Sequence, residues 1–436
     1  MASYSIQAVR GMNDLLPEVI DAWQCLEAVL RQVTAAYGYR EIRTPVLERT
    51  ALFQRSIGTD TDIVSKEMYT FLDLNGESLT LRPEATASCV RAGLEHGLFH
   101  NQQQRFWYVG PMFRHEKPQK GRYRQFHQFG IEAFGWPGPD IDAEIIAVGE
   151  RLWRTLGLGP VVLEINSLGS GESRRRFRDD LVAYLTAHES ALDADSRGRL
   201  QTNPLRVLDS KHPETQSVVA AAPSLIDYLD SDCRRHFDGF CARLDDLKVN
   251  YRINPRLVRG LDYYSRTVFE WVTDRLGAQN AICAGGRYDG LVETLGGKSV
   301  PAAGFAVGVE RVLELLALSK PLAPGIVPDL FIAAFGEGAN QTAFVLAERL
   351  RTAGMTVISQ CGGGGAKRQL RQADRSGARY ALVLGDDELA RGEIAVKPLR
   401  SDAPQFLVSL SKIEHELELL LRSEPAQPAM AAHERG

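Results

Sequence analysis

The sequence has none of the segments that carry a chain into or across a membrane. No apolar run among its 436 residues approaches the roughly 18 residues of a membrane span, and the N-terminus, MASYSIQAVRGMND, has no apolar secretory core. None of the six scattered cysteines forms a CxxC or a Cys/His metal spacing. These absences predict a cytoplasmic enzyme with reduced, mostly buried thiols and no membrane association, and they leave any metal requirement unknown.

Positive charge is not in excess either. The chain has 51 Lys and Arg against 55 Asp and Glu, a net charge of −4 at pH 7. This balance excludes a histone-like protein held on nucleic acid by bulk charge, but it allows a local basic groove on an acidic body. The stretch CGGGGAKR (361–368) lacks the Lys-[Ser/Thr] pair and the glycine spacing of a P-loop, and no GxGxxG follows a predicted strand. A nucleotide site must therefore use side chains.

The clearest local feature is an aromatic-rich hairpin, predicted from strands at 105–114 and 124–135 around a basic loop. Because strand side chains alternate with a period of two, Gln128 and Glu132 share one face with a glycine between them, and Arg114 shares a face with another glycine. Such a face is poor core material and suits a ligand lying on the sheet, because glycine lets the ligand approach the backbone. The alternative is a solvated face with incidental charge.

Arginines on three separate segments indicate an anion site. Arg311 falls in the first turn of a helix predicted within 300–318, where a cation is favoured only if it and the helix end both face an anion. Together with Arg114 and Arg259 it could hold a triphosphate, because a guanidinium group matches phosphate oxygens. Three carboxylates fit the remaining needs, an ammonium group, a base edge or Mg²⁺: Glu84, Glu116 and Glu132.

Several stretches then occur in an order typical of one enzyme family. YGYREIRTPVLERTALFQRSIG (37–58), the hairpin at 105–135 and AAGFAVGVERVLELL (302–316) are similar to motifs 1, 2 and 3 of class II aminoacyl-tRNA synthetases. LVRGLDYYSRTVFE (257–270) and GGRYDGL (285–291) resemble stretches specific to the histidyl-tRNA synthetases, and LRPEATA and NPLRVLDSK add to the match. From residue 5 to about 420 the chain resembles that family.

The resemblance implies an α/β fold with an α+β catalytic core, a six-stranded antiparallel sheet with flanking helices. Beyond 329, strands alternate with helices, which favours a small α/β domain with a mainly parallel sheet. The expected division is a first segment of the catalytic core (1–170), a helical insertion (171–250), a second segment of the core (251–320), a linker (321–328), a mixed α/β anticodon-binding domain (329–422) and a disordered tail (423–436).

The implied reaction has two steps: L-histidine attacks the α-phosphate of ATP, with Mg²⁺, and the histidyl group then passes to the 3′ end of tRNA(His). By resemblance, Arg114 and Arg259 act on the α-phosphate, and Arg259 also contacts histidine. The implied histidine ligands are Glu84, Thr86, Gln128, Glu132, Tyr263, Tyr264 and Tyr288. The implied ATP ligands are Arg114, Glu116, Arg122 and Arg311. No general base is needed, because the attacking carboxylate is already ionised at neutral pH.

The resemblance also implies a homodimer, formed largely through motif 1, and contacts with tRNA. The expected tRNA ligands are Gln119 and, on a basic helix within 366–380, Lys367, Arg368 and Arg371, followed by Arg375 and Arg379. A solvated helix face is the alternative for that helix. Two other function classes stay open at this point: a regulatory paralogue, which typically lacks the C-terminal domain, and a stand-alone tRNA-binding or stress-sensing domain.

Overall fold

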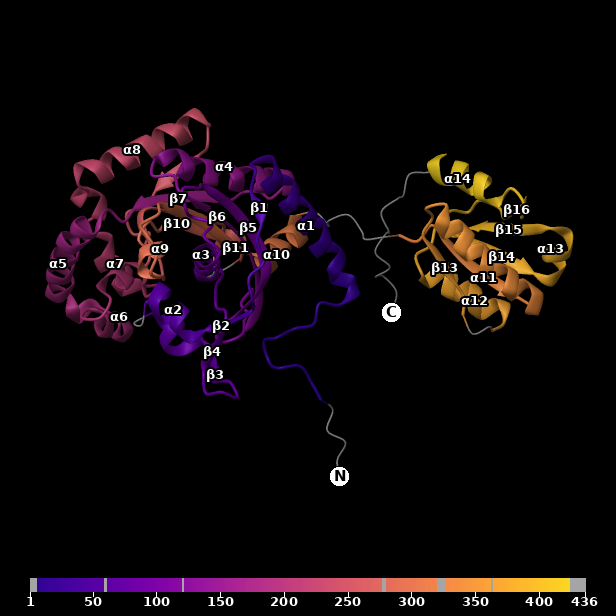
Figure 1. Ribbon diagram of the computed structural model, residues 1–436, viewed down its shortest axis with the longest axis horizontal. Coiled ribbons are helices and arrows are strands. Elements are labelled where there is room, and N and C mark those ends of the chain that lie inside the picture. Colours follow the sequence, from indigo (N-terminus) through magenta and orange to yellow (C-terminus); the bar gives the residue numbers. More distant parts are fainter. Residues whose placement is uncertain are drawn as a thin grey trace, which may run out of the picture. The chain divides into compact units, whose positions relative to one another are not determined.

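The computed structural model describes residues 6–58, 61–119, 121–276, 280–319, 327–361 and 364–423. Its contacts divide the chain into two units, Met1–Pro321 and Leu322–Gly436. Figure 1 shows the elements of each unit. Most of the expected linker lies outside the described residues. So does the expected disordered tail, apart from Ser423 at the end of the last helix.

The larger unit is built on an eight-stranded sheet (Figure 1). In spatial order its strands are β1 (Arg40–Glu41), β5 (Gln104–Phe113), β6 (Gln125–Phe134), β11 (Ala302–Gly308), β10 (Ala281–Arg287), β9 (Ser265–Val272), β7 (Val162–Ser167) and β8 (Tyr251–Ile253). The six strands from β5 to β7 pair antiparallel throughout, as expected. The two edge strands add parallel pairs that the sequence did not indicate, because strands of two and three residues show no periodicity.

Helices cover one face of this sheet. α1 (Pro17–Ala36), α4 (Pro139–Leu156) and α10 (Val309–Ser319) pack against one another and against β6 and β11. Phe129 of β6 and Val307 of β11 meet Leu26 of α1 and Trp153 of α4 in this layer. Since side chains alternate along a strand, the neighbouring residues of β6 and β11 face the other way.

A smaller sheet and a helical insertion complete the larger unit. The smaller sheet has the order β2 (Leu47–Arg49), β4 (Ser78–Leu81), β3 (Tyr69–Leu72), beside α2 (Thr50–Ile57), α3 (Thr86–Glu95), α9 (Leu291–Thr294) and a π-helical turn (Ile63–Glu67). The sequence REIRTPV (40–46) predicts a short strand, and this prediction is wrong beyond Glu41, where β1 ends. Pro45, which has no N–H to donate, lies in the irregular segment that follows. The insertion holds α5 (Gly171–Ala187), α6 (Ala194–Arg199), α7 (Pro213–Ala220), α8 (Ser231–Asp246) and 3₁₀ turns at Glu189–Ala191, Pro204–Asp209 and Leu225–Tyr228, and a further 3₁₀ turn, Asp274–Leu276, follows β9.

The smaller unit is a five-stranded mixed sheet with helices. Its strands, in spatial order, are β13 (Val357–Ser359), β12 (Leu330–Phe335), β14 (Tyr380–Gly385), β15 (Glu393–Pro398) and β16 (Phe406–Ser409), and its helices are α11 (Glu337–Thr352), α12 (Ala366–Arg375), α13 (Asp386–Arg391) and α14 (Ile413–Ser423). Only β13, β12 and β14 are parallel. The expectation of a mainly parallel sheet is therefore wrong for β15 and β16, because the connection through the six-residue α13 is too short for a parallel crossover.

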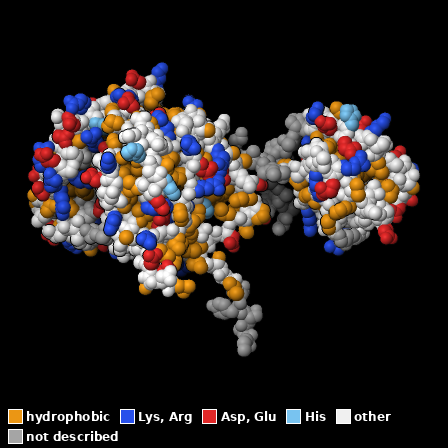
Figure 2. Space-filling model, viewed as in Figure 1, with side chains coloured by type: hydrophobic (Ala, Val, Ile, Leu, Met, Phe, Trp, Pro, Cys, Tyr) orange, Lys and Arg blue, Asp and Glu red, His pale blue; other side chains and the backbone are white. Residues whose placement is uncertain are grey.

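The surface and interior agree with the composition. On the face drawn in Figure 2, basic and acidic side chains are intermingled over the larger unit. No helix in the described residues of the chain is long and apolar enough to cross a membrane. Cys89, Cys233 and Cys283 are buried, whereas Cys361 is exposed. Within the described ranges no cluster of three or more His, Cys, Asp or Glu side chains could hold a metal ion.

Candidate active site

A cleft of about 670 Å³ lies on the face of the large sheet that α1 and α4 leave open. Its walls include Gln128 and Glu132 of β6 and three small residues of β11, Gly304, Ala306 and Gly308. The loop before β9 and the insertion segment around residues 206–219 form further walls. The prediction that Gln128 and Glu132 share one face of the hairpin is therefore confirmed, and that face lines the cleft.

The glycines on this face have a different use from the one expected. A Cβ on Gly304 would lie 2.1 Å from Glu132 Oε2, and a Cβ on Gly130 would lie 2.3 Å from the hydroxyl of Tyr108. A Cβ on Gly110 would lie 2.6 Å from a guanidinium nitrogen of Arg82. These glycines therefore make room for neighbouring protein side chains rather than for a ligand at the backbone.

At one end of the cleft a buried carboxylate is held by two hydroxyl groups. Thr86 Oγ1 donates to Glu132 Oε1 at 2.7 Å, and the hydroxyl of Tyr288 donates to Glu132 Oε2. Glu132 is only 1% exposed, and burial raises its pKa to about 8 although both hydroxyl donors act in the opposite direction. Burial therefore favours the protonated form of Glu132 in this end of the cleft.

Three tyrosine rings surround this carboxylate end. The ring centroids of Tyr263 and Tyr264 lie 4.7 Å apart, and those of Tyr263 and Tyr288 lie 5.6 Å apart. Gln128 Oε1 is buried and has no hydrogen-bond partner among the described residues. The pocket thus combines aromatic walls with an open hydrogen-bond acceptor, which suits a small ring carrying polar nitrogens.

Glu84 stands at the start of α3, beside this pocket. Its two oxygens accept hydrogen bonds from the backbone N–H groups of Thr86 and Ala87, at 2.7 and 2.9 Å. Burial is the largest influence on Glu84 and raises its pKa, against the effect of these two donors. The N-terminus of α3 fixes the Glu84 carboxylate, and the Glu84 side chain lines the cleft.

At the other end of the cleft arginines gather around a single carboxylate. Arg122 NH1 lies 3.0 Å and Arg114 NH1 lies 4.0 Å from the Glu116 carboxylate. Arg311 joins them from α10, where its Nε donates to the Gly121 carbonyl at 3.3 Å. Burial, and then the charges of Arg122 and Arg114, lower the pKa of Arg311. The excess of positive charge favours a polyanion at this end.

Arg259 lies between the two ends. It forms an ion pair with Glu270 of β9, and its guanidinium carbon lies 5.3 Å from the ring centroid of Tyr264. Burial is the largest influence and lowers the pKa of Arg259, but its interactions with Glu270, Tyr264 and Tyr263 together outweigh burial, and the pKa is raised. Glu270 was not predicted from the sequence, although an acidic residue inside the apolar strand TVFEWV was a signal for it.

The insertion also contributes to the cleft, which the sequence analysis did not assign. Arg206, Asp209 and Lys211 line its rim. Asp209 lies 3.8 Å from Arg206 NH1 and 3.2 Å from Lys211 Nζ. Arg206 lies against Gly260, where an added Cβ would be 3.3 Å from its NH1. These three charged residues all lie in the stretch NPLRVLDSK (203–211), and their clustering between two helical segments could have indicated a role in the site.

The expected tRNA ligands lie outside the cleft. Gln119 is exposed in the loop between β5 and β6, where it bridges to Arg122. Lys367, Arg368 and Arg371 are exposed on α12 of the smaller unit. Arg379 differs, because α12 ends at Arg375 and Arg379 lies 3.5 Å from Asp329. Its placement on the basic helix is therefore wrong.

The antiparallel sheet, its flanking helices and a cleft that joins a closed polar pocket to an arginine cluster define the catalytic core of a class II aminoacyl-tRNA synthetase. Residues 11–173 and 178–312 match the family Histidyl-tRNA synthetase, and residues 329–419 match the family Anticodon binding domain. The chain belongs to the histidyl-tRNA synthetase family.

Individual relatives agree with this assignment. The chain is 57% identical over 411 residues to a histidine--tRNA ligase of Thiobacillus denitrificans, covering 94% of this chain and 98% of that one. It is similar to the crystal structure of apo S. aureus histidyl-tRNA synthetase, with a TM-score of 0.80, 35% identity, and coverage of 95% and 100% of the two chains. A histidyl-tRNA synthetase from Nostoc sp. PCC 7120 has the same fold, with a TM-score of 0.67, 20% identity, and coverage of 96% and 100%.

Proposed function

We propose that this chain activates L-histidine with ATP to histidyl-adenylate and pyrophosphate, and transfers the histidyl group to the 3′ end of tRNA(His). One observation carries the proposal: a single cleft joins the Glu132 pocket with its three tyrosines to the arginines around Glu116. The Glu132 end suits an amino acid with a polar ring, and the arginine end suits a triphosphate. The α-carboxylate and the α-phosphate then meet between them, beside Arg259.

At the Glu132 end, the pocket recognises both polar ends of histidine. Glu84 and Thr86 hold the ammonium group, because a buried carboxylate at hydrogen-bond distance favours a cation. Glu132, Gln128, Tyr263, Tyr264 and Tyr288 surround the imidazole ring. Imidazole needs one donor and one acceptor, and a site that supplies both strongly rejects apolar side chains of similar size.

At the arginine end, the arginines stabilise negative charge on the phosphates, and no residue needs to act as a general acid or base. Arg114 and Arg259 stabilise the charge that develops on the α-phosphate when the histidine carboxylate attacks it, and Arg311 holds the terminal phosphate. Glu116 and Arg122 complete the ATP site. Arg259 keeps its charge at every working pH, so it stabilises the transition state without exchanging a proton.

We also propose that Mg²⁺ accompanies ATP. The described residues contain no cage for the ion. Mg²⁺ needs only one or two carboxylates when phosphates supply other oxygens. Glu116 and Glu310 line the cleft, and these carboxylates would hold the ion. It would neutralise phosphate charge.

The remaining segments serve tRNA and assembly. The smaller unit reads the anticodon, with Lys367, Arg368 and Arg371 of α12 on the phosphates, and Gln119 and the insertion lie toward the acceptor end. The chain works in the cytoplasm as a homodimer. Apolar side chains exposed before α1, at its start and on β2 support the dimer: Ile6, Val9, Leu16, Val19 and Leu47. Figure 2 shows hydrophobic side chains on the drawn face of the larger unit.

Paired variants test the two ends of the cleft separately. Glu132→Gln should weaken histidine binding in calorimetry by at least about tenfold and leave ATP binding unchanged, because it changes only the buried hydrogen-bond pattern. Arg311→Ala should weaken ATP binding and leave histidine binding unchanged. Arg235→Ala, at an exposed arginine of α8 that does not line the cleft, is the control. The reverse pattern, or equal effects on both ligands, would contradict the assignment.

A further inference from the structure

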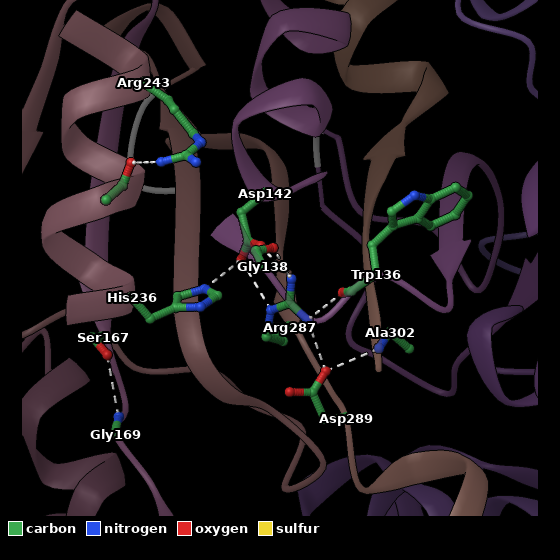
Figure 3. Close-up of polar contacts among 11 residues, drawn as sticks. Trp136, Gly138, Asp142, Ser167, Gly169, His236, Arg243, Arg287, Asp289 and Ala302 are labelled. Carbon is green, nitrogen blue, oxygen red and sulfur yellow. Dashed lines mark hydrogen bonds and ion pairs between the residues drawn. The ribbon is translucent and has the colours of Figure 1, made fainter. Parts of the chain in front are cut away.

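A buried charge cluster lies behind the histidine pocket and has no role in the chemistry described above. Arg287, the last residue of β10, is completely buried. Its guanidinium group forms an ion pair with Asp142 of α4, and it donates to the carbonyl oxygens of Gly138 and Trp136 at 2.8 and 3.0 Å. It also donates to Asp289 Oδ1 at 3.0 Å. Figure 3 shows these partners converging on one guanidinium group.

Each N–H group of the Arg287 guanidinium has an acceptor. A buried ion pair is tolerated only when its remaining hydrogen bonds are satisfied in this way. Burial is the largest influence and raises the pKa of Asp142, but the charge of Arg287 and the hydrogen bonds of His236 and Arg287 together outweigh burial and hold the pKa well below the usual range. The insertion touches the same carboxylate, because His236 Nε2 of α8 lies 3.5 Å from Asp142 Oδ1 (Figure 3). Three separate elements of the unit, α4, β10 and α8, therefore meet at Asp142.

The cluster is directly connected to the cleft through Tyr288, the next residue in the chain. The backbone N–H of Tyr288 donates to the Ala302 carbonyl at 2.8 Å. Asp289, on its other side, accepts the Ala302 N–H at 2.9 Å through the oxygen that also binds Arg287. The backbone on both sides of Tyr288 is thus fixed, and its hydroxyl donates to Glu132.

We propose that Arg287, Asp142 and Asp289 form a positioning unit that sets where Tyr288 and Glu132 stand in the cleft, and thereby the fit of the imidazole ring. This inference rests on the proposed function, since it assigns the pocket to histidine. None of the three side chains lines the cleft. They act through the backbone of Tyr288 and not by touching the substrate.

The position of the unit makes its effect selective. The arginines at the phosphate end come from other elements: Arg114 follows β5, and Arg311 begins α10. A shift of Tyr288 therefore changes the histidine end of the cleft and leaves the ATP end in place. Displacing a pocket wall by about 1 Å is enough to cost up to 10²-fold in a positioned reaction.

The test measures ATP–pyrophosphate exchange, with rates divided by the number of active sites found by titration. The variants are Asp142→Asn and Asp289→Asn. Glu144→Gln is the matched control: it lies two residues from Asp142 on α4, pairs with Arg105 of β5 at 2.9 Å and does not line the cleft. We expect both Asn variants to raise the KM for histidine by at least about tenfold, with the KM for ATP within about twofold of wild type. The control should leave both constants unchanged.

The outcomes separate positioning from general stability. A variant that only loses active sites, with an unchanged KM for histidine at those that remain, would overturn the proposal, and so would an equal rise in both KM values. If Asp142→Asn does not fold, Asp289→Ala decides the matter, with the same rise expected in the KM for histidine. Asp289 is partly exposed, and this change removes the oxygen that accepts from both Arg287 and the Ala302 N–H. A wild-type protein with no histidine-dependent exchange would instead refute the proposed function itself.

Discussion

Replacing Glu132 with Gln should remove a pH dependence from the stability of the ligand-free protein. Burial raises the pKa of Glu132 from 4.5 to about 8. Between these two values the folded state holds a proton that the unfolded state has released. The stabilisation is therefore complete below about pH 4.5 and is lost as the pH rises through about 8.

The size of the effect follows from the linkage relation. At 1.36 kcal/mol per pKa unit, the contribution of Glu132 falls by about 3 kcal/mol between pH 5.5 and pH 8.5. This corresponds to roughly 6 °C in the Tm of the larger unit, at about 2 °C per kcal/mol. The amide side chain of the Glu132→Gln variant cannot ionise, so the variant should lack this loss.

The assay is thermal unfolding of wild type and Glu132→Gln at a series of pH values without ligand. The Tm difference, wild type minus variant, should decrease as the pH rises from 5.5 to 8.5. Glu95→Gln, at an exposed carboxylate on α3, should show the pH profile of wild type. Parallel profiles for wild type and Glu132→Gln would refute the reasoning, because Glu132 would then be ionised in the folded protein at neutral pH.

Three further results are expected. Arg259→Ala should lower kcat for adenylation by at least about 10²-fold with little change in histidine affinity. Glu270→Gln keeps the guanidinium group of Arg259, so its kcat should fall much less. A large loss of histidine binding at unchanged kcat would instead assign Arg259 to binding. Gly304→Ala should reduce histidine affinity because its Cβ would overlap Glu132, whereas Gly290→Ala has open space and should behave as wild type in the same titration. Replacing Lys367, Arg368 and Arg371 together with Ala should weaken tRNA(His) binding and reduce the slope of log affinity against log salt by about 2 to 3, with adenylation unchanged; an unchanged slope would separate α12 from the tRNA.

Much of the fold follows from local patterns in the sequence. The long hairpin, the strand that runs into α10 and the alternation beyond residue 329 all have clear periodicity, and the structure contains them at nearly the expected bounds. The parity of β6 also predicts that Gln128 and Glu132 share one face. The parallel pairing of the edge strands β1 and β8 could not be predicted, because it depends on neighbours that are distant in the sequence.

The partners of the site residues were harder to predict for the same reason. Glu270 pairs with Arg259 across a loop, and Asp142 meets Arg287 from 145 residues away. A single sequence shows that each is charged within an apolar segment, but not which opposite charge it meets. The glycines of this face were predicted correctly, but their role was predicted wrongly. The side chains that fill the space above them, Glu132, Tyr108 and Arg82, come from segments that are distant in the sequence.

The central claim is that this one cleft activates histidine and does so without tRNA. ATP–pyrophosphate exchange, run with each of the twenty amino acids on the full chain, tests it most directly. Exchange should require histidine, proceed in the absence of tRNA and fall by at least about 10²-fold in Arg259→Ala. Exchange driven by a different amino acid, or none with histidine, would contradict the account.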